Sequence, residues 1–282
     1  MPRISRRHFL WATAALAATP AKSVNAGPLA GRIRIAVKYQ MIQETDLSVK
    51  QKLEMLRKIG FDGVELKVDD KVDQDEVVAA TKETGFPVHG IINAAHEDIR
   101  PSVELAHRLG CDSVLVLARE FPDISYEENF ARWKKNVRAV IPLAEQHEIK
   151  LCIENVRATF LKTAEKMVSF IDFFESPVVR SYFDLGNTIT WTEQPAERWA
   201  EVLGERVYKL DIKDRGHAEF GEARLKREGA VGTNGGEVHW ERVRNILDRN
   251  DFSGWATAEV AGGDSKKLKR MAGWMRDVLD LD

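Results

Sequence analysis

The sequence predicts a single (β/α)₈ barrel, and three observations carry this prediction. From Arg32 onward, short apolar runs rich in β-branched residues alternate with amphipathic stretches of helical period, eight of each. The chain after residue 26 has 256 residues, close to the about 250 of a typical barrel. An open doubly wound sheet usually carries a glycine-rich turn after its first strand, whereas residues 40–44 contain no glycine.

The expected elements follow one another in strict strand–helix order. The predicted strands are residues 33–39, 63–68, 87–93, 113–118, 150–156, 179–184, 207–212 and 255–260. The predicted helices are residues 48–59, 73–84, 99–109, 126–147, 163–174, 196–203, 239–249 and 264–279. Gly60, Gly85 and Gly110 stand just past three of these helices, where a left-handed cap is wanted. Strands separated by helices cannot pair through tight turns, so we expect a parallel sheet covered by the helices.

The first 26 residues have the composition of an export signal. A basic start precedes a short apolar run at 11–18, and small residues precede the end at Ala26. The string Ser5-Arg6-Arg7-His8-Phe9-Leu10 resembles the twin-arginine type. We therefore expect residues 1–26 to be a signal peptide, residues 27–282 to form the barrel, and the protein to be periplasmic or secreted. An uncleaved anchor is the alternative, although the run is shorter than the about 20 residues of a stable membrane span.

Composition and charge exclude several classes of protein. Hydrophobic residues make up 44% of the chain and charged residues 30%, which excludes a disordered or fibrous protein. The formal net charge of −2 becomes −6 without the four bases of the signal, so nucleic acid is not an expected partner. Cys111 and Cys152 lie in or beside strand-like runs, and we expect two buried thiols rather than a disulfide.

Four consecutive predicted strands close on an acidic residue, namely Glu154, Asp184, Asp211 and Glu259. The active site of a parallel barrel forms at these strand ends. Because clustered carboxylates raise each other's pKa values and oppose folding, a divalent cation would stabilise the set. Oxygen ligands favour Mg²⁺ or Mn²⁺, with Co²⁺ or Zn²⁺ as alternatives. In the alternative without metal, each acid caps the following helix or pairs with a basic loop residue.

Five motifs stand near the ends of the later strands. They are Ile153-Glu154-Asn155, Phe183-Asp184-Leu185-Gly186-Asn187, Asp211-Ile212-Lys213-Asp214, Gly235-Gly236-Glu237-Val238-His239-Trp240 and Ala258-Glu259. In order and spacing they resemble the xylose-isomerase-like TIM barrels, the sugar phosphate isomerase/epimerase group. The resemblance implies that Glu154, Asp184, Asp211 and Glu259 hold one divalent metal ion. It also implies a sugar isomerase or epimerase in which Glu154 and Glu259 exchange a substrate proton through an enediolate.

Strand seven departs from the family pattern, since Asp211 stands where the family commonly has His. The resulting all-carboxylate site is one charge more negative and should prefer harder cations. By strand alternation, Lys209, Asp211 and Lys213 point to the same face. We therefore expect Lys209 beneath the acids, where it offsets the additional charge or, in a non-catalytic relative, replaces the cation.

Five further residues are candidates for binding substrate hydroxyls: Glu65, His96, Asn187, Lys213 and His217. In the alternative without a substrate role, Glu65 forms an ion pair with Lys67 or Lys38. The loop histidines His96 and His217 are then solvated or have a structural role. Asn187 stands where the epimerase branch commonly has His. The charged, glycine-rich loop 215–237, which contains His217 and Arg224, is expected to form a mobile lid over the barrel mouth.

The leading hypothesis is a metal-dependent sugar isomerase or epimerase that acts on a non-phosphorylated sugar or keto-sugar, because export argues against a phosphorylated substrate. A lyase or dehydratase acting on a keto-sugar or inosose is the second, since the sequence also resembles the inosose dehydratase branch. A non-catalytic carbohydrate-binding protein is the third. An endonuclease of the same superfamily is the weakest, because its multi-zinc site needs many His ligands. The sequence leaves open whether the protein is a homo-oligomer.

Overall fold

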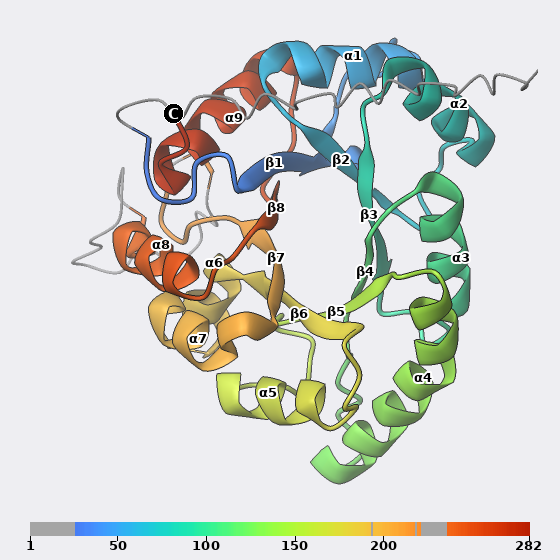
Figure 1. Cartoon of the computed structure of the whole chain (residues 1–282), viewed down its shortest axis with the longest axis vertical. Coiled ribbons are helices and arrows are strands. Elements are labelled where there is room, and N and C mark those ends of the chain that lie inside the picture. The colour runs from blue at the N-terminus through green and yellow to red at the C-terminus, as the bar shows by residue number, and fades with distance from the viewer. Residues whose placement is uncertain (1–25, 193, 218, 221–235) are drawn as a thin grey trace, which may run out of the picture.

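The computed structural model shows a closed barrel of eight parallel strands in the order β1 to β8, and it describes residues 26–192, 194–217, 219–220 and 236–282 (Figure 1). The strands are β1 (Ile33–Lys38), β2 (Gly63–Lys67), β3 (Val88–Ala94), β4 (Ser113–Val116), β5 (Lys150–Glu154), β6 (Val179–Asp184), β7 (Val207–Ile212) and β8 (Gly254–Ala258). β1 pairs with β8 as well as with β2, which closes the ring.

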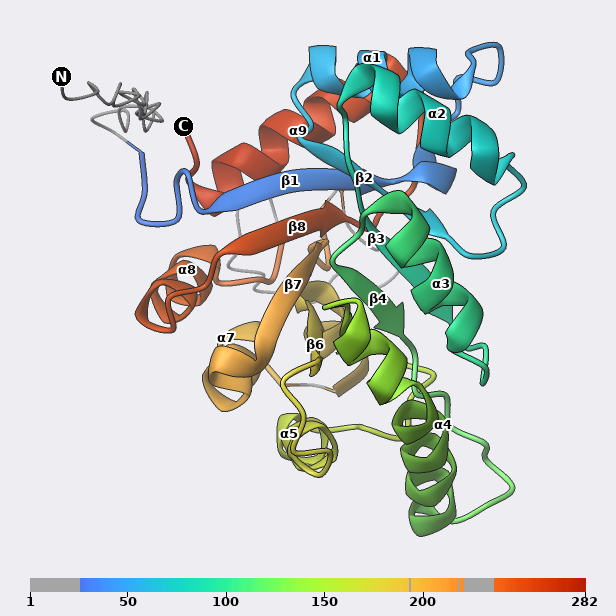
Figure 2. The same cartoon turned by 45° about the vertical axis from the view of Figure 1, so that its right-hand side comes forward.

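Within the described ranges, eight longer helices are present, and they surround the ring (Figures 1 and 2). They are α1 (Val49–Ile59), α2 (Gln74–Thr84), α3 (Arg100–Leu109), α4 (Tyr126–Gln146), α5 (Ala164–Asp172), α7 (Ala196–Leu203), α8 (Trp240–Arg249) and α9 (Ser265–Leu279). The short elements are η1 (Tyr39–Met41), α6 (Leu185–Asn187), the π-helix η2 (Thr188–Thr192) and η3 (Gly204–Arg206). The predicted strands and long helices are confirmed, with ends that differ by at most two residues.

Local sequence signals explain where the helices begin and end. Ser48 and Ser125 start α1 and α4 as capping boxes, in which the serine side chain accepts a hydrogen bond from a backbone N–H in the first turn. Gly60 and Gly110 end α1 and α3 in the left-handed conformation, with φ of 105° and 71°. The helices therefore stop where the sequence predicts, and the short joints that follow lead straight into β2 and β4.

Residues 1–25 of the predicted export signal lie outside the described residues, so the structure does not test that prediction. Within the described part of the chain, no helix has the length and apolar character needed to cross a bilayer. Cys111 and Cys152 are both free thiols with buried side chains.

The interior of the barrel contains a buried polar network in place of a purely apolar core. Lys209 Nζ lies 2.8 Å from His89 Nδ1 and 2.5 Å from Asp112 Oδ1. His89 Nε2 lies 3.1 Å from the Thr257 hydroxyl, which is 2.9 Å from the Tyr182 hydroxyl. Lys209 therefore lies beneath the acids, as expected, but its contacts are with His89 and Asp112 and not with the four carboxylates whose charge it was expected to offset. Lys209 shares the inward face of Asp211, but it is two residues earlier in β7 and contacts groups deeper in the barrel.

We expect Lys209→Met to destabilise the protein by about 1–3 kcal/mol, because it leaves the His89 and Asp112 acceptors without their donor. Urea unfolding measures the change, and Lys150→Met at the start of β5 is the matched control. If Lys209 instead compensates the acid cluster, the substitution will also tighten Mn²⁺ binding, which should otherwise stay at its wild-type value.

Candidate metal and active site

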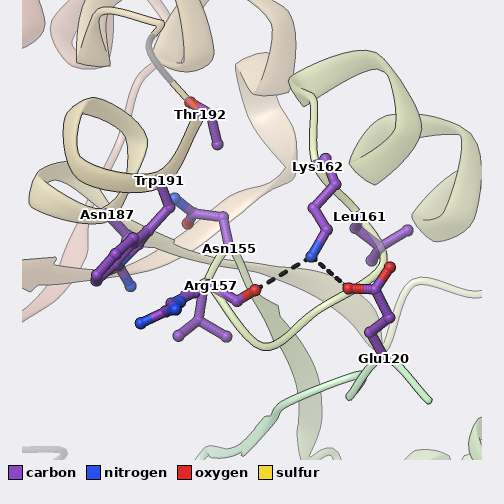
Figure 3. A pocket seen from close by; sticks show the side chains of 9 residues that line it. Glu120, Asn155, Arg157, Leu161, Lys162, Asn187, Trp191 and Thr192 are labelled. Carbon is purple, nitrogen blue, oxygen red and sulfur yellow. Dashed lines mark hydrogen bonds and ion pairs between the residues drawn. The ribbon is translucent and has the colours of Figure 1, made fainter. Parts of the chain in front are cut away.

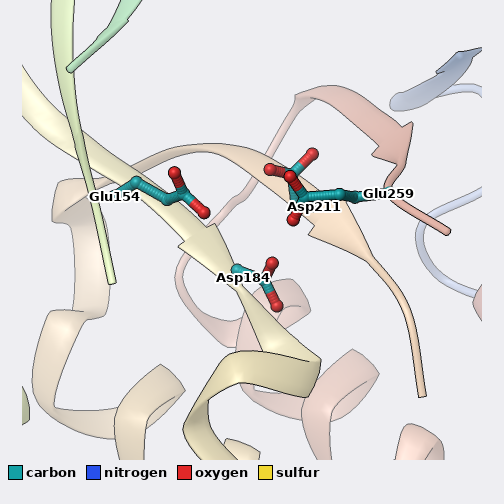
Figure 4. Close-up of side chains that lie close together, drawn as sticks. All are labelled: Glu154, Asp184, Asp211 and Glu259. Atoms are coloured by element: carbon teal, nitrogen blue, oxygen red, sulfur yellow. The ribbon is translucent and has the colours of Figure 1, made fainter. Parts of the chain in front are cut away.

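The four strand-end acids converge at one place in the barrel mouth (Figure 4). Glu154 ends β5, Asp184 ends β6, Asp211 is the last residue but one of β7, and Glu259 directly follows β8. One side-chain oxygen from each lies within 4.8 Å of the corresponding oxygens of the other three. Glu154, Asp184 and Asp211 are buried, whereas 32% of the Glu259 side chain is exposed. The structure thus brings together the four residues predicted as metal ligands.

Two lysines that lie against the acids provide the compensation that the sequence analysis assigned to Lys209. Lys38, the last residue of β1, places Nζ 2.9 Å from Asp211 Oδ2 and 2.5 Å from Glu259 Oε1. Lys213 places Nζ 2.9 Å from Asp184 Oδ2 and 2.8 Å from Glu259 Oε2. Glu259 therefore accepts one lysine at each of its oxygens. From the sequence, Lys38 was expected only as a partner of Glu65, although its position at the end of β1 is the signal that indicates its place at the acids.

Burial and the two lysines shift the pKa values of the four acids in different directions. Burial, strengthened by the charge of Glu259, raises the pKa of Glu154 to about 8. Burial also holds the pKa values of Asp184 and Asp211 well above their usual range, against the opposing charges of Lys213 and Lys38. Burial opposes ionisation of Glu259 too, but Lys38 and Lys213 outweigh it and keep its pKa below the usual value.

The composition of the cluster fits a hard divalent cation. When all four carboxylates are ionised, as ion binding requires, they and the two ammonium groups leave two negative charges, which a divalent ion would neutralise. Asp211 Oδ1 is buried without a hydrogen-bond partner among the described residues, as expected for an oxygen that is free to bind a metal. All four donors are carboxylates, the ligands that Mg²⁺ and Mn²⁺ prefer.

Two asparagines fix the carboxylates of β5 and β6. Asn187 Nδ2 donates to Glu154 Oε1 at 3.3 Å, and the Asn187 backbone N–H donates to Asp184 Oδ1 at 2.8 Å. Asn155 donates to the Asp184 carbonyl and accepts from the Asp184 N–H, both at 2.8 Å. The motif Ile153-Glu154-Asn155 does not by itself indicate a role for Asn155. Its two bonds hold the carboxyl ends of β5 and β6 in register, and they orient Asp184 towards the cluster.

The five predicted substrate-binding residues do not form one group. Asn187 and Lys213 contact the acids, as described above. Glu65 is fully buried and accepts a hydrogen bond from the Tyr182 hydroxyl, within the polar network of the barrel interior. His96 is half exposed and lies 3.5 Å from Asp69. His217 is buried, and its Nδ1 accepts from the backbone N–H groups of Glu219 and Phe220, so it stabilises a turn.

The described part of the predicted lid is anchored by Asp214. Its Oδ1 accepts from the backbone N–H groups of Glu237 and Val238, and its Oδ2 accepts from Trp240 Nε1 at 2.9 Å. Gly236 approaches this carboxylate so closely that a Cβ there would overlap it. These contacts fix the return of the loop towards α8. Arg224 and the rest of residues 221–235, on which the lid prediction depends, lie outside the described residues.

Comparison with known proteins identifies the family. The family model described as the xylose isomerase-like TIM barrel matches residues 53–278. This chain belongs to the xylose isomerase-like TIM barrel family. The resemblance drawn from the strand-end motifs is therefore confirmed. The four acids of this xylose isomerase-like barrel lie at the carboxyl ends of β5 to β8.

Curated relatives of this xylose isomerase-like barrel include two sugar phosphate epimerases of Escherichia coli. The putative L-ribulose-5-phosphate 3-epimerase SgbU of strain K12 is 22% identical over 209 residues, which are 62% of this chain and 71% of the relative. L-ribulose-5-phosphate 3-epimerase UlaE of strain O1:K1 / APEC is 21% identical over 264 residues, with 80% of this chain and 88% of the relative covered.

Solved structures show the same fold at lower identity. The apo structure of the 3-keto-D-glucoside 4-epimerase YcjR from E. coli matches with a TM-score of 0.68 and 16% identity, over 87% of this chain and 99% of that one. The D-allulose 3-epimerase from Methylomonas sp. matches with a TM-score of 0.69 and 16% identity, over 88% of this chain and 98% of that one. At this identity, the likeness establishes the shared barrel alone.

Proposed function

We propose that this protein is a divalent-metal-dependent sugar isomerase or epimerase that acts on a non-phosphorylated sugar or keto-sugar. The observation that carries the proposal is the convergence of Glu154, Asp184, Asp211 and Glu259, whose oxygens lie within 4.8 Å of one another. Relatives and structural neighbours named as sugar epimerases support it. We infer Mn²⁺ or Mg²⁺ as the ion because all four ligands are carboxylates.

Glu154, Asp184, Asp211 and Glu259 would hold the ion, which would act as a Lewis acid and make the C–H next to a substrate carbonyl more acidic. Glu154 and Glu259 approach the same space from different sides of the mouth (Figure 4). One of them removes the proton and the other returns it. Without the ion, burial raises the pKa of Glu154 to about 8, and a bound cation would lower it again, because positive charge favours the ionised carboxylate. Lys38 and Lys213 keep Glu259 ionised and orient it, and Asn187 orients Glu154.

The proposal is tested by incubating the metal-loaded protein in D₂O with a panel of ketoses and keto-glycosides. Proton exchange next to a carbonyl gives a product heavier by one deuterium, or an epimer that separates by chromatography. We expect exchange with at least one non-phosphorylated member of the panel. Exchange confined to phosphorylated sugars would contradict the substrate class, and its absence from every carbonyl sugar would contradict the reaction.

A lyase or dehydratase is the second candidate, and Asn187 is the observation that favours it. Asn187 contacts Glu154, at the position where the epimerase branch commonly has a titratable His. An amide can orient a carboxylate, but it does not transfer protons at neutral pH. After the same proton removal, expulsion of a β-hydroxyl or alkoxide would give a product that has lost water or an alcohol. The mass of the product distinguishes the two candidates.

We also propose export by the twin-arginine route, on the basis of Arg6 and Arg7 and the apolar run after them. Arg6→Lys with Arg7→Lys is expected to retain the protein in the cytoplasm, because this transport system reads the arginine pair. Immunoblotting of periplasmic and cytoplasmic fractions measures the result, with Arg3→Lys as the control. Equal export of the double variant and the wild type would overturn the assignment.

A further inference from the structure

A cavity of about 350 Å³ opens beside the acid cluster, between the segments that follow β5 and β6 (Figure 3). Its size falls within the range of about 300–1,000 Å³ seen for sites that hold whole small molecules. Of the residues that line it, the mechanism described above uses only Asn187. A monosaccharide bound through its reacting carbons at the acids therefore leaves this cavity to be filled by another part of the substrate.

The cavity is joined to the cluster by two of its own lining residues. Asn155 and Asn187 line it, and both also contact the acids, through Asp184 and Glu154 respectively. Trp191, on the π-helix η2, donates from Nε1 to Asn187 Oδ1 at 3.0 Å. The chain Trp191–Asn187–Glu154 thus links the wall of the cavity to a proton-transfer residue.

Trp191 forms an aromatic wall. It is 37% exposed, and among the described residues it is the one large hydrophobic side chain that is exposed rather than buried. The Arg157 guanidinium lies over its ring at 4.9 Å from the centroid, and among the described residues Arg157 makes no ion pair. An exposed tryptophan next to hydrogen-bonding groups is suited to the apolar C–H face of a sugar ring.

Lys162 and Glu120 line the side of the cavity that faces Trp191 (Figure 3). Lys162 Nζ donates to Glu120 Oε2 at 2.6 Å and to the Arg157 carbonyl at 3.1 Å. The Glu120 backbone N–H donates to the Ala158 carbonyl at 2.6 Å, so this side is tied to the segment after β5. The cavity is therefore preformed, and it offers both donors and acceptors for hydroxyl groups.

The charges of the lining favour a neutral occupant. Glu120 neutralises Lys162, so among the described residues of the lining the Arg157 guanidinium is the charge without an ion-pair partner. A phosphoryl dianion would be met by one guanidinium and would lie close to the Glu120 carboxylate, at an electrostatic cost. A neutral sugar ring has no such cost, and the lining offers its hydroxyls both donors and acceptors.

We propose that this cavity is a subsite for a second, neutral glycosyl unit, so that the substrate is a keto-glycoside of at least two rings. Trp191 contacts the face of the second ring, and Arg157 with the Lys162–Glu120 pair binds its hydroxyls. The inference rests on the proposed function, because it places the reacting ring at the acid cluster. It names the substrate class within that function and makes Trp191 the main determinant of specificity.

The test compares a keto-disaccharide with the methyl glycoside of the same keto-monosaccharide, using kcat/KM for solvent-deuterium exchange. We expect wild type to prefer the disaccharide, and Trp191→Ala to lower that preference at least about tenfold. Trp191→Phe keeps an aromatic ring but loses the hydrogen bond to Asn187, so it should retain most of the preference. Arg157→Ala should also lower the preference for the disaccharide, because Arg157 binds hydroxyls of the second ring. Its matched control is Arg138→Ala on α4, whose guanidinium stacks on Phe173 outside the site.

Two outcomes separate this inference from the proposed function. If both compounds exchange and Trp191→Ala lowers the two kcat/KM values equally, the subsite is overturned and the proposed function stands.

If neither compound exchanges, the proposed function fails, and calorimetry with the reduced, unreactive disaccharide tests the subsite alone. Binding that Trp191→Ala weakens at least about tenfold supports the subsite. Equal binding by wild type and Trp191→Ala, or a larger effect of Trp191→Ala on a phosphorylated keto-sugar, overturns it.

Discussion

Glu154→Gln is expected to lower the rate of solvent-deuterium exchange by about 10²–10⁴-fold, the usual contribution of a positioned acid or base. The amide retains the size and the contact with Asn187, but it cannot accept or return a proton. Glu259→Gln should give a loss of the same order, because exchange requires a group on each side of the substrate carbon. Exchange is followed by mass spectrometry in D₂O with saturating Mn²⁺.

The controls separate proton transfer from metal binding and folding. Glu83→Gln alters an exposed glutamate whose partner is Lys50 on the outer surface, and it should exchange at the wild-type rate. Metal content and urea unfolding are measured for each variant, so that a loss of exchange with the ion still bound is attributed to proton transfer. If Glu154→Gln retained the wild-type rate with the ion bound, Glu154 would have no part in proton transfer.

Lys38→Met is expected to produce two effects of opposite sign. In the presence of a metal chelator, the free energy of unfolding should fall by about 3–5 kcal/mol. The reason is that Asp211 and Glu259 lose a buried ammonium group that lies within 2.9 Å of each. Mn²⁺ should bind at least about tenfold more tightly, because the remaining site is one charge more negative. Urea unfolding with and without Mn²⁺, together with a calorimetric titration, measures both effects.

Lys50→Met is the matched control, because Lys50 forms an ion pair with Glu83 at the surface and lies away from the acids. It should leave both the unfolding curves and the Mn²⁺ titration at their wild-type values. Weaker Mn²⁺ binding by Lys38→Met than by wild type would show that Lys38 supports the metal site rather than competing with it for charge. The charge balance drawn above would then be wrong.

The fold was predictable because the short apolar runs of the strands and the 3.6-residue period of the helices are both local sequence patterns. The alternation of apolar runs with amphipathic stretches identifies the eight strands and eight long helices, and caps such as Ser48 and Gly60 place their ends. The strand-end acids were predictable for a related reason. The carboxyl ends of parallel strands meet at one mouth, so residues far apart in sequence, such as Glu154 and Glu259, converge.

The remaining site features depend on how deep a side chain lies in the barrel and on irregular backbone segments. The periodic sequence pattern predicts neither of these. Alternation places Lys209 on the inward face of β7, but only the three-dimensional register shows that it contacts His89 and not the acids. Lys38 reaches the acids because β1 closes the ring against β8, a long-range pairing. Trp191 lies on a π-helix that has no sequence signature of its own. The cavity beside the acids was therefore not predictable from the sequence.

Metal stoichiometry tests the central claim most directly. The purified chain and an Asp184→Asn/Asp211→Asn variant are dialysed against Mn²⁺ and then against metal-free buffer, and retained metal is measured by plasma mass spectrometry. We predict one Mn²⁺ per wild-type chain and none in the variant, because two of the four carboxylates have become amides. A wild-type chain that retains no divalent ion, or a variant that retains as much as wild type, would contradict the account.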